Sequence, residues 1–431
     1  MMKELQAERF ALSSLTVYRE IRNDPVIRLL IKLMSQQYPS VFDAAEDYAQ
    51  MYALLSESSC KGDLTAYIYE KTLYSDNAFT RQAAWGQYKT MSPAIRVAAA
   101  RDLTTLWRAS AVDAARLKGC IAAQFEDGSL RQLVENLPDY DALPPAKLED
   151  WGSDIDFVAD FALHHGYGVY AQYNSFLLTP DHNGEVHLEP VTNPDDIRLT
   201  DLKGYERERK VIIDNTLALI DGVKANNILL YGDRGTGKSS SVKAILNEYA
   251  DQGLRLVEVS KYNLKYLGVL VKLLQNNPLK FIIFTDDLSF AESDDNYTAM
   301  KAVLDGSSMK LSDNAVIYAT SNRRHLVKES FSGREGDEVH LADTLDEAAS
   351  LSDRFGITVT FLSPNRKKFN EIVLLLAKDK GLELPEEELL EQANIWATRK
   401  SNFSPRCARQ FIDHVHSRVT RGLPYEWVKK A

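Results

Sequence analysis

The first part of the chain has the apolar spacing of amphipathic helices. Val26, Leu29 and Leu33 recur at intervals of three and four residues, and Leu103 and Leu106 repeat this spacing further along. Such a stripe places apolar side chains on one side of a helix, where neighbouring helices pack together. Only four glycines occur in the first 150 residues, so few turns are obligatory there. We therefore predict a mostly helical N-terminal domain.

The pattern changes after the pair Pro144-Pro145. Residues 166–191 contain two alternating apolar segments around Asn183-Gly184, a pair typical of a β-hairpin with a type I′ turn. The polar stretch Pro194-Asp195-Asp196 then has the composition of a linker. We expect the N-terminal domain to span residues 1–195 and to contain this hairpin near its end.

From residue 196, short apolar runs rich in valine and isoleucine alternate with helix-like segments. The runs are Asn227–Tyr231, Leu254–Val259, Phe281–Phe284, Ala315–Ala319 and Ile357–Phe361. Short buried strands that alternate with helices indicate a parallel sheet covered on both faces. Helical spacing returns at residue 363 and continues to the end. The predicted fold class is α/β, with a core at 196–362 and a helical region at 363–431.

One motif in this core points to specific chemistry. It fits the pattern G-x-x-x-x-G-K-[ST] between a predicted strand and a predicted helix, which is the context that a phosphate-binding loop requires. The motif consists of Gly232, Asp233, Arg234, Gly235, Thr236, Gly237, Lys238 and Ser239, with Ser240 next in the helix. Its glycines let backbone N–H groups surround a phosphate at the start of a helix. Lys238 is then expected to contact the β- and γ-phosphates of ATP, and the Ser239 hydroxyl to bind Mg²⁺.

Two carboxylates follow the apolar run that ends at Phe284. At the carboxyl edge of a parallel sheet, Asp286 can reach the Mg²⁺ beside Ser239, and Asp287 can polarise an attacking water. A solvated strand end with a helix N-cap is the alternative interpretation. ATPases of this type more often carry Glu at the second position. Because Asp287 is one methylene shorter, it could be a working base, a weaker base, or one that shares the task with Glu292.

Three more polar residues are candidates because of their positions. Asn322 follows the strand run at 315–319, where it can hydrogen-bond the γ-phosphate or the water, although a polar loop start is the alternative. Arg354 comes just before the last strand run, and Arg406 opens a C-terminal helix that can fold back over the phosphates. For either arginine alone, a solvated or ion-paired role is the commoner outcome.

The order of these motifs resembles the AAA+ class of ATPases over about residues 196–431. The strings FTDDLSF and LSDRFG in particular look like a bacterial AAA+ family catalogued as a domain of unknown function. The resemblance implies a sheet with strand order 5-1-4-3-2, a C-terminal helical lid and assembly into a homo-oligomeric ring such as a hexamer.

The same resemblance implies roles for individual residues. Residues 232–239 match the Walker A loop, and the two acids after Phe284 match Walker B. Asn322 matches sensor 1, Arg354 matches an arginine finger that acts on a neighbouring subunit's ATP, and Arg406 matches sensor 2. Just upstream, Gly204 and Tyr205 match the segment that closes over adenine.

Composition and charge indicate which partners and which location to expect for the protein. The 431 residues contain 51 basic and 61 acidic residues, a net charge of −10. All of this excess lies before residue 196, so it favours a basic partner for the N-terminal domain and says little about partners of the core. No apolar run approaches the ~20 residues that span a membrane. The charged start and three separated cysteines lead us to expect a cytoplasmic protein.

The leading functional hypothesis is an ATP-hydrolysing AAA+ protein that couples hydrolysis between subunits to remodelling of an unknown macromolecular partner. A second hypothesis is an ATP-dependent binding or loading module that hydrolyses slowly or not at all, for which Asp287 leaves room. A third, action on DNA, depends only on the basic segment from residue 396 to the end, with eight basic and two acidic residues.

Overall fold

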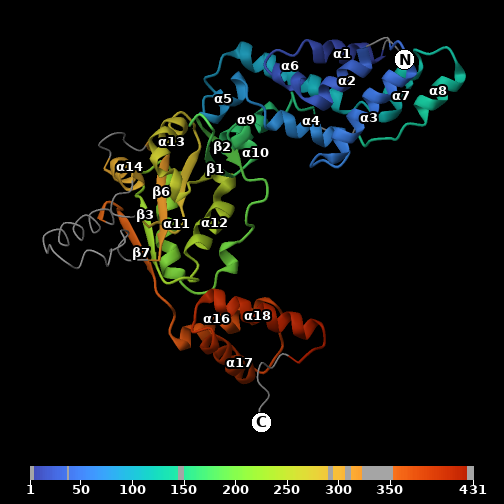
Figure 1. Ribbon diagram of the computed structural model, residues 1–431. Helices are drawn as coiled ribbons and strands as arrows, with labels where there is room; N and C mark the ends of the chain where they lie inside the picture. Colours follow the sequence, from blue (N-terminus) through green and yellow to red (C-terminus); the bar gives the residue numbers. More distant parts are fainter. Residues whose placement is uncertain are drawn as a thin grey trace. The chain divides into compact units, whose positions relative to one another are not determined.

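The computed structural model describes residues 4–35, 38–143, 150–289, 295–305, 312–322 and 353–424. Contacts divide the chain into two compact units, residues 1–172 and 173–431. In Figure 1 the first unit runs from blue to blue-green, and the second runs from green to red.

The described residues of the first unit are helical, which confirms the predicted helical character of this region. Its elements are α1 (Glu4–Ser13), the 3-10 turn η1 (Arg19–Asn23), α2 (Pro25–Ser35), α3 (Val41–Glu57), α4 (Leu64–Leu73), α5 (Ala78–Ala84), α6 (Pro93–Ser110), α7 (Ala114–Ala122), α8 (Gly128–Glu135), α9 (Ile155–His165) and α10 (Val169–Gln172). Polar caps begin several of them: Ser40, Asp63 and Asn77 each accept a hydrogen bond from a backbone N–H in the first turn that follows.

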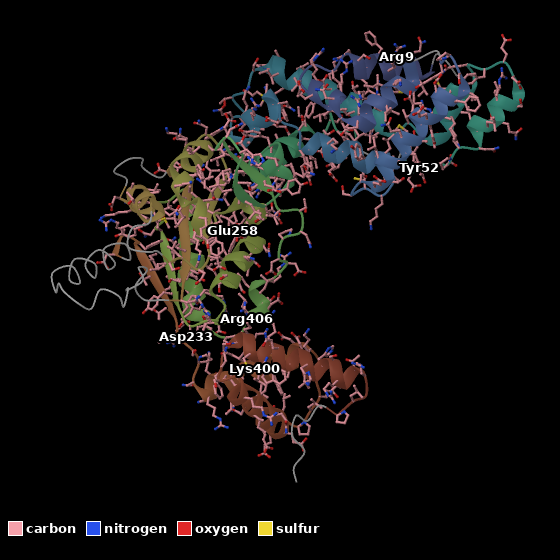
Figure 2. The ribbon with its side chains drawn as sticks, viewed as in Figure 1. Arg9, Tyr52, Asp233, Glu258, Lys400 and Arg406 are labelled. Carbon is pink, nitrogen blue, oxygen red and sulfur yellow. The ribbon has the colours of Figure 1, made fainter. Side chains whose placement is uncertain are left out.

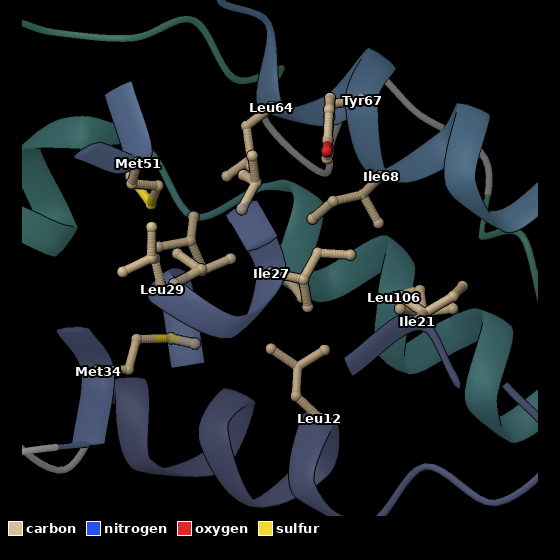
Figure 3. Packing of buried hydrophobic residues seen from close by; sticks show 14 of the residues in the cluster. Leu12, Ile21, Ile27, Leu29, Met34, Met51, Leu64, Tyr67, Ile68 and Leu106 are labelled. Atoms are coloured by element: carbon tan, nitrogen blue, oxygen red, sulfur yellow. The ribbon is translucent and has the colours of Figure 1, made fainter. Parts of the chain in front are cut away.

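The core of the first unit joins side chains from most of its helices. Figure 3 shows Leu12 of α1, Ile27 of α2, Met51 of α3, Ile68 of α4 and Leu106 of α6 converging on one apolar cluster. Each of these side chains is fully buried. The apolar stripe of the sequence thus becomes the contact surface between helices, and the first unit has a core of its own.

The second unit is built on a sheet of seven strands among the described residues. The strands are β1 (Ser175–Pro180), β2 (Val186–Pro190), β3 (Ile228–Gly232), β4 (Leu254–Glu258), β5 (Lys280–Thr285), β6 (Ala315–Ser321) and β7 (Ile357–Phe361). Their order across the sheet is β2-β1-β4-β5-β6-β3-β7, and the five strands β3 to β7 are parallel to their neighbours. Read in chain order, those five give 5-1-4-3-2, which confirms the AAA+ fold class.

Helices cover both faces of this sheet. Helices α11 (Glu206–Ile220) and α12 (Lys238–Tyr249) share an apolar cluster with alternate residues of the strands, such as Leu230 of β3 and Ile282 of β5. Figure 1 shows α13 (Leu267–Leu274) and α14 (Asp295–Leu304) on the other side. With both faces covered, the strands are continuous apolar runs, as the sequence indicated.

The β1–β2 hairpin belongs to the sheet of the second unit, whereas the sequence analysis assigned it to the N-terminal domain. Strand β1 pairs in parallel with β4, and Phe176 and Leu178 are buried. The hairpin turn also differs from the predicted type I′. Pro180 pairs with Val186, and Asp181 N donates to Glu185 O, so three residues form the loop, with Gly184 at φ +80°. An apolar strand pattern does not tell which sheet the strand joins.

The C-terminal helices form a small bundle. Helices α16 (Arg366–Asp379), α17 (Glu386–Arg399) and α18 (Pro405–Thr420) pack around Phe369, Leu389 and Phe411. The remaining short elements are the 3-10 turns η3 (Leu199–Asp201), η4 (Ala250–Gln252) and η5 (Lys261–Tyr266). Within the described residues, no helix combines the length and apolar character needed to cross a membrane.

Candidate functional site

The phosphate loop leaves the sheet at Gly232, the last residue of β3. Its φ is +137°, and a Cβ atom there would lie 2.0 Å from the carbonyl oxygen of Phe361. Asp233 N donates to that same carbonyl at 2.9 Å. The Asp233 carboxylate accepts a hydrogen bond from Ser363 N at 2.7 Å, and this bond lowers the pKa of Asp233. Glycine is therefore required at 232, and the loop is fixed to the end of β7.

Lys238, the first residue of α12, extends back under the loop. It is 7% exposed, and its Nζ donates to Gly232 O and Asp233 O at 2.8 Å and to Asn322 Oδ1 at 3.1 Å. Burial lowers the pKa of this ammonium group. All three acceptors are neutral, so among the described residues no anion is bonded directly to this buried charge.

The two acids after β5 lie beside the loop, and both are hydrogen-bonded to the hydroxyl of Thr320. Asp286 Oδ1 accepts a hydrogen bond from Ser239 Oγ at 2.6 Å and another from Thr320 Oγ1 of β6. Thr320 Oγ1 also accepts from Asp287 N at 2.9 Å. Asp287 has φ +50°, a left-handed conformation that Asp tolerates better than most residues. Thr320 therefore fixes both the carboxylate of one acid and the backbone of the next.

Asn322 connects the lysine to the second acid. Its Nδ2 donates to Asp287 Oδ1 at 2.7 Å while its Oδ1 accepts from Lys238. The predicted lysine, acid and amide thus form one continuous hydrogen-bonded chain, although they come from α12 and from the loops after β5 and β6.

A polar cavity of about 670 Å³ lies over this constellation. Residues 234–240 line it together with Asp286, Asp287 and Asn322. The segments 195–197 and 201–203 and the lid residues Ile372 and Arg406 also belong to the lining. The size is within the usual range for a site that binds a small organic molecule.

The lid contacts the phosphate loop directly. Arg406 N donates to Gly235 O at 3.1 Å, and a Cβ atom at Gly235 would lie 2.8 Å from Ser404 Oγ. Figure 2 labels Asp233 at the end of the core and Arg406 at the start of the lid helix α18. The Arg406 side chain is exposed and lines the cavity.

Gly204 and Tyr205 do not line the cavity, but the two residues just before them do. Both have positive φ, +76° and +61°. The Tyr205 hydroxyl donates to Leu362 O at 2.5 Å, its ring centroid lies 5.3 Å from that of Phe361, and burial raises its pKa to about 12. Tyr205 therefore anchors the segment that borders the cavity.

Arg354 lies outside the residues that line the cavity. Its Nε forms an ion pair with Asp305, the residue after α14. Arg354 therefore differs from Arg406, which does line the cavity. Glu292, the residue suggested to share the task of Asp287, lies outside the described residues.

Sequence reasoning missed three residues of this site. Thr320 sits in the string that contains Asn322, but a threonine in a strand has no distinguishing pattern. Arg209 of α11 and Arg409 of α18 both line the cavity. Arg209 is buried, which lowers its pKa, and donates to Leu202 O at 2.8 Å. Arg409 follows Arg406 by three residues, so helical spacing alone could have identified it.

The residues present fit a nucleotide with Mg²⁺. No hydrogen bond between described residues occupies the backbone N–H groups of residues 234–237, which lie at the start of α12. Those donors and Lys238 suit phosphate oxygens. Ser239 Oγ and Asp286 Oδ1 would supply two oxygen ligands, and Mg²⁺ commonly takes the rest from phosphates and water. Accordingly, the described part of the chain holds no cluster of three or more His, Cys, Asp or Glu suited to a metal.

The chain is similar to one described protein family and to several solved structures. The model of a family described as "Protein of unknown function (DUF815)" matches residues 172–419. No curated protein matches the chain. Similar solved structures include two point mutants of Thermotoga maritima RuvB, each 17% identical, with TM-scores of 0.37 and 0.38. The T. maritima RuvB Holliday junction branch migration motor is 16% identical, with a TM-score of 0.36. These matches cover 53%, 52% and 52% of this chain and 67%, 66% and 66% of theirs.

Proposed function

Since this chain belongs to the DUF815 family, whose description assigns no function, we propose one from its own site: ATP hydrolysis that drives remodelling of a macromolecular partner. The observation that carries the proposal is the hydrogen-bonded chain from Lys238 through Asn322 to Asp287, beside the Ser239–Asp286 pair. In the proposal these residues act as the phosphate-binding cation, the carboxylate base and the magnesium ligands at one edge of the sheet.

In the proposed reaction, water attacks the γ-phosphorus of ATP and the bond to the β-phosphate oxygen breaks, which releases ADP and phosphate. Asp287 accepts the proton of the water, and Asn322 positions either the water or the γ-phosphate. Lys238 and the free N–H groups of residues 234–237 balance the charge of the phosphates. Mg²⁺, held by Ser239 and Asp286, would neutralise charge that develops on the β- and γ-oxygens.

The two arginines receive different roles in this proposal. Arg406 lines the cavity and can contact phosphate within the same subunit. Arg354, outside that lining, is proposed to act on the ATP of a neighbouring subunit in a homo-oligomeric ring. Such a finger is worth about 10³–10⁵ in rate.

The test is the ATPase rate per subunit as a function of protein concentration. We expect the wild-type specific rate to rise with concentration as subunits assemble, because a neighbour must supply Arg354. Arg354→Ala should lower the plateau at least about 100-fold while ATP affinity stays within a few fold. Arg28→Ala, which removes an exposed arginine in the first unit, is the control. A specific rate that is independent of concentration and indifferent to Arg354→Ala would overturn the inter-subunit mechanism.

A slowly hydrolysing ATP-dependent binding module is the second candidate. It is favoured by the short side chain of Asp287, one oxygen of which accepts a hydrogen bond from Asn322 in this structure. Tight ATP binding without measurable turnover, unchanged by Asp287→Asn, would select this candidate. Action on DNA is not proposed, because Arg406 and Arg409 of the basic segment line the cavity and Arg418 bonds Pro424 O.

A further inference from the structure

The first unit contains a second cavity, of about 320 Å³, that the proposed ATPase does not use. The matched family region reaches only the last residue of this unit. The lining comes from the start of α4, from Leu143, and from the turn and first residues of α9. We call this cavity the aromatic pocket.

Aromatic rings form the wall of the aromatic pocket. The ring centroids of Tyr69 and Trp151 are 4.9 Å apart with planes inclined at 49°. Trp151 and Val158 are buried at 7% and 2% exposure, whereas Phe157 and Leu143 remain 47% and 43% exposed. The pocket therefore has a buried base and an exposed apolar rim, which is the arrangement of a surface that receives a side chain from outside.

One carboxylate at the aromatic pocket, that of Asp154, is available to bind a ligand. Asp154 occupies the N-cap position of α9, yet its side chain makes no capping hydrogen bond. Its carboxylate has no ion pair or hydrogen bond with another described residue. Its charge lies close to Tyr69, whose pKa is raised by burial and then by Asp154. The Tyr69 hydroxyl likewise has no hydrogen-bond partner in the described part of the chain.

The acidic residues of the first unit are concentrated in the last part of its sequence. Residues 126–172 contain ten acidic and two basic residues, a net charge of −8, whereas residues 1–125 contain 15 basic and 13 acidic residues. Within this acidic segment, residues 150–160, which contribute to the pocket, contain four acidic and no basic residues. Neighbouring acids are already bonded: Asp150 accepts from Thr104 Oγ1, and Asp156 accepts from the Tyr88 hydroxyl. Asp154 thus stands out as the acid available to a ligand of the pocket.

We propose that the aromatic pocket binds an arginine side chain from a basic segment of a partner protein. A guanidinium group stacks on aromatic faces and donates to a carboxylate, and the pocket offers both in Tyr69, Trp151, Phe157 and Asp154. The net charge of −4 of residues 150–160, which contribute to the pocket, favours a segment with several basic residues over a single small cation. The exposed rim at Phe157 and Leu143 supplies apolar contact for the residues that flank the arginine.

The test measures binding of a fluorescent arginine–glycine repeat peptide to the full-length protein by anisotropy. We expect Phe157→Ala and Asp154→Asn each to weaken binding at least about fivefold, in line with the energy of a partly desolvated cation–π contact or charged hydrogen bond. Matched controls are Phe42→Ala, which removes a phenyl group that is 77% exposed elsewhere, and Glu126→Gln, which removes one exposed charge of the same acidic segment. Both controls should change affinity less than about twofold.

Three outcomes overturn the proposal. The first is no saturable binding of the peptide. The second is an equal loss with Glu126→Gln and Asp154→Asn, which assigns the affinity to general acidity. The third is displacement of the peptide by an equal concentration of tetramethylammonium ion, which assigns the pocket to small cations. Because Phe157 and Asp154 are exposed, both variants should fold, and thermal unfolding of each checks this.

Discussion

The nucleotide cavity and the aromatic pocket differ in what holds them together. In the nucleotide cavity, the backbone of one contiguous stretch, residues 232–240, forms the phosphate loop. Side chains from two neighbouring strand ends complete the site. The aromatic pocket is assembled from side chains at residues 63–69, 143 and 151–158, with no shared backbone motif. A site made of backbone conformation demands particular residues at fixed spacing, whereas a site made of side chains demands only a suitable surface.

The largest effect that this comparison predicts is at Gly232. Alanine there combines an unfavourable φ of +137° with a Cβ placed 2.0 Å from Phe361 O, so Gly232→Ala should lower the free energy of unfolding by about 3 kcal/mol. Gly184→Ala is the control, because its φ is +80° but the space around its Cβ is open, and about 1 kcal/mol is expected. Urea unfolding of the two variants measures the difference. Equal midpoints would mean that the backbone of the loop is not fixed by Phe361.

The next effect concerns charge rather than backbone. Lys238→Ala removes the buried ammonium group of the phosphate loop, and ATP affinity should fall about 100-fold, a loss of about 2.7 kcal/mol. Lys210→Ala, which removes an exposed lysine paired with Asp214 on α11, should change it less than about twofold. Calorimetric titration with ATP provides the affinities. Arginine-peptide binding to the aromatic pocket should be the same in both variants, and a parallel loss would contradict the independence of the two sites.

The difference between the sites also explains how much of the molecule could be predicted from sequence. The alternation of apolar runs and helices indicated a parallel sheet, whereas its strand order was implied only by the resemblance to AAA+ proteins. Gly232 to Ser239 were identified as candidates from a spacing typical of a phosphate loop. The hairpin at Asn183-Gly184 was visible as a hairpin, but its pairing with β4 was not. Parallel pairing between residues 81 positions apart, such as Phe176 and Val257, leaves no local pattern.

Side-chain assemblies were correspondingly harder to predict. The aromatic pocket could not be predicted, because Tyr69 and Trp151 meet only through the packing of α4 against the turn before α9. Acidic composition pointed to a basic partner for the N-terminal region, but the first unit is acidic only after residue 125. The roles of Asn322, Arg354 and Arg406 stay predictions, since position in a strand order does not establish what a side chain does.

The smallest effect is expected at Thr320. This strand side chain fixes a backbone N–H, so the position combines an assembly of side chains with one of backbone. Thr320→Val keeps the shape but removes the hydroxyl that donates to Asp286 and accepts from Asp287 N. We expect the ATPase rate to fall about tenfold while ATP affinity stays nearly unchanged, as for other groups that orient a metal ligand. Thr320→Ser retains the hydroxyl and should restore most of the rate.

A loss that serine does not rescue would mean that Thr320 acts through packing, and that Asp286 and Asp287 are positioned by the sheet alone. The Mg²⁺ dependence of the rate separates the two cases, because loss of the bond to Asp286 should raise the Mg²⁺ concentration needed for half-maximal activity.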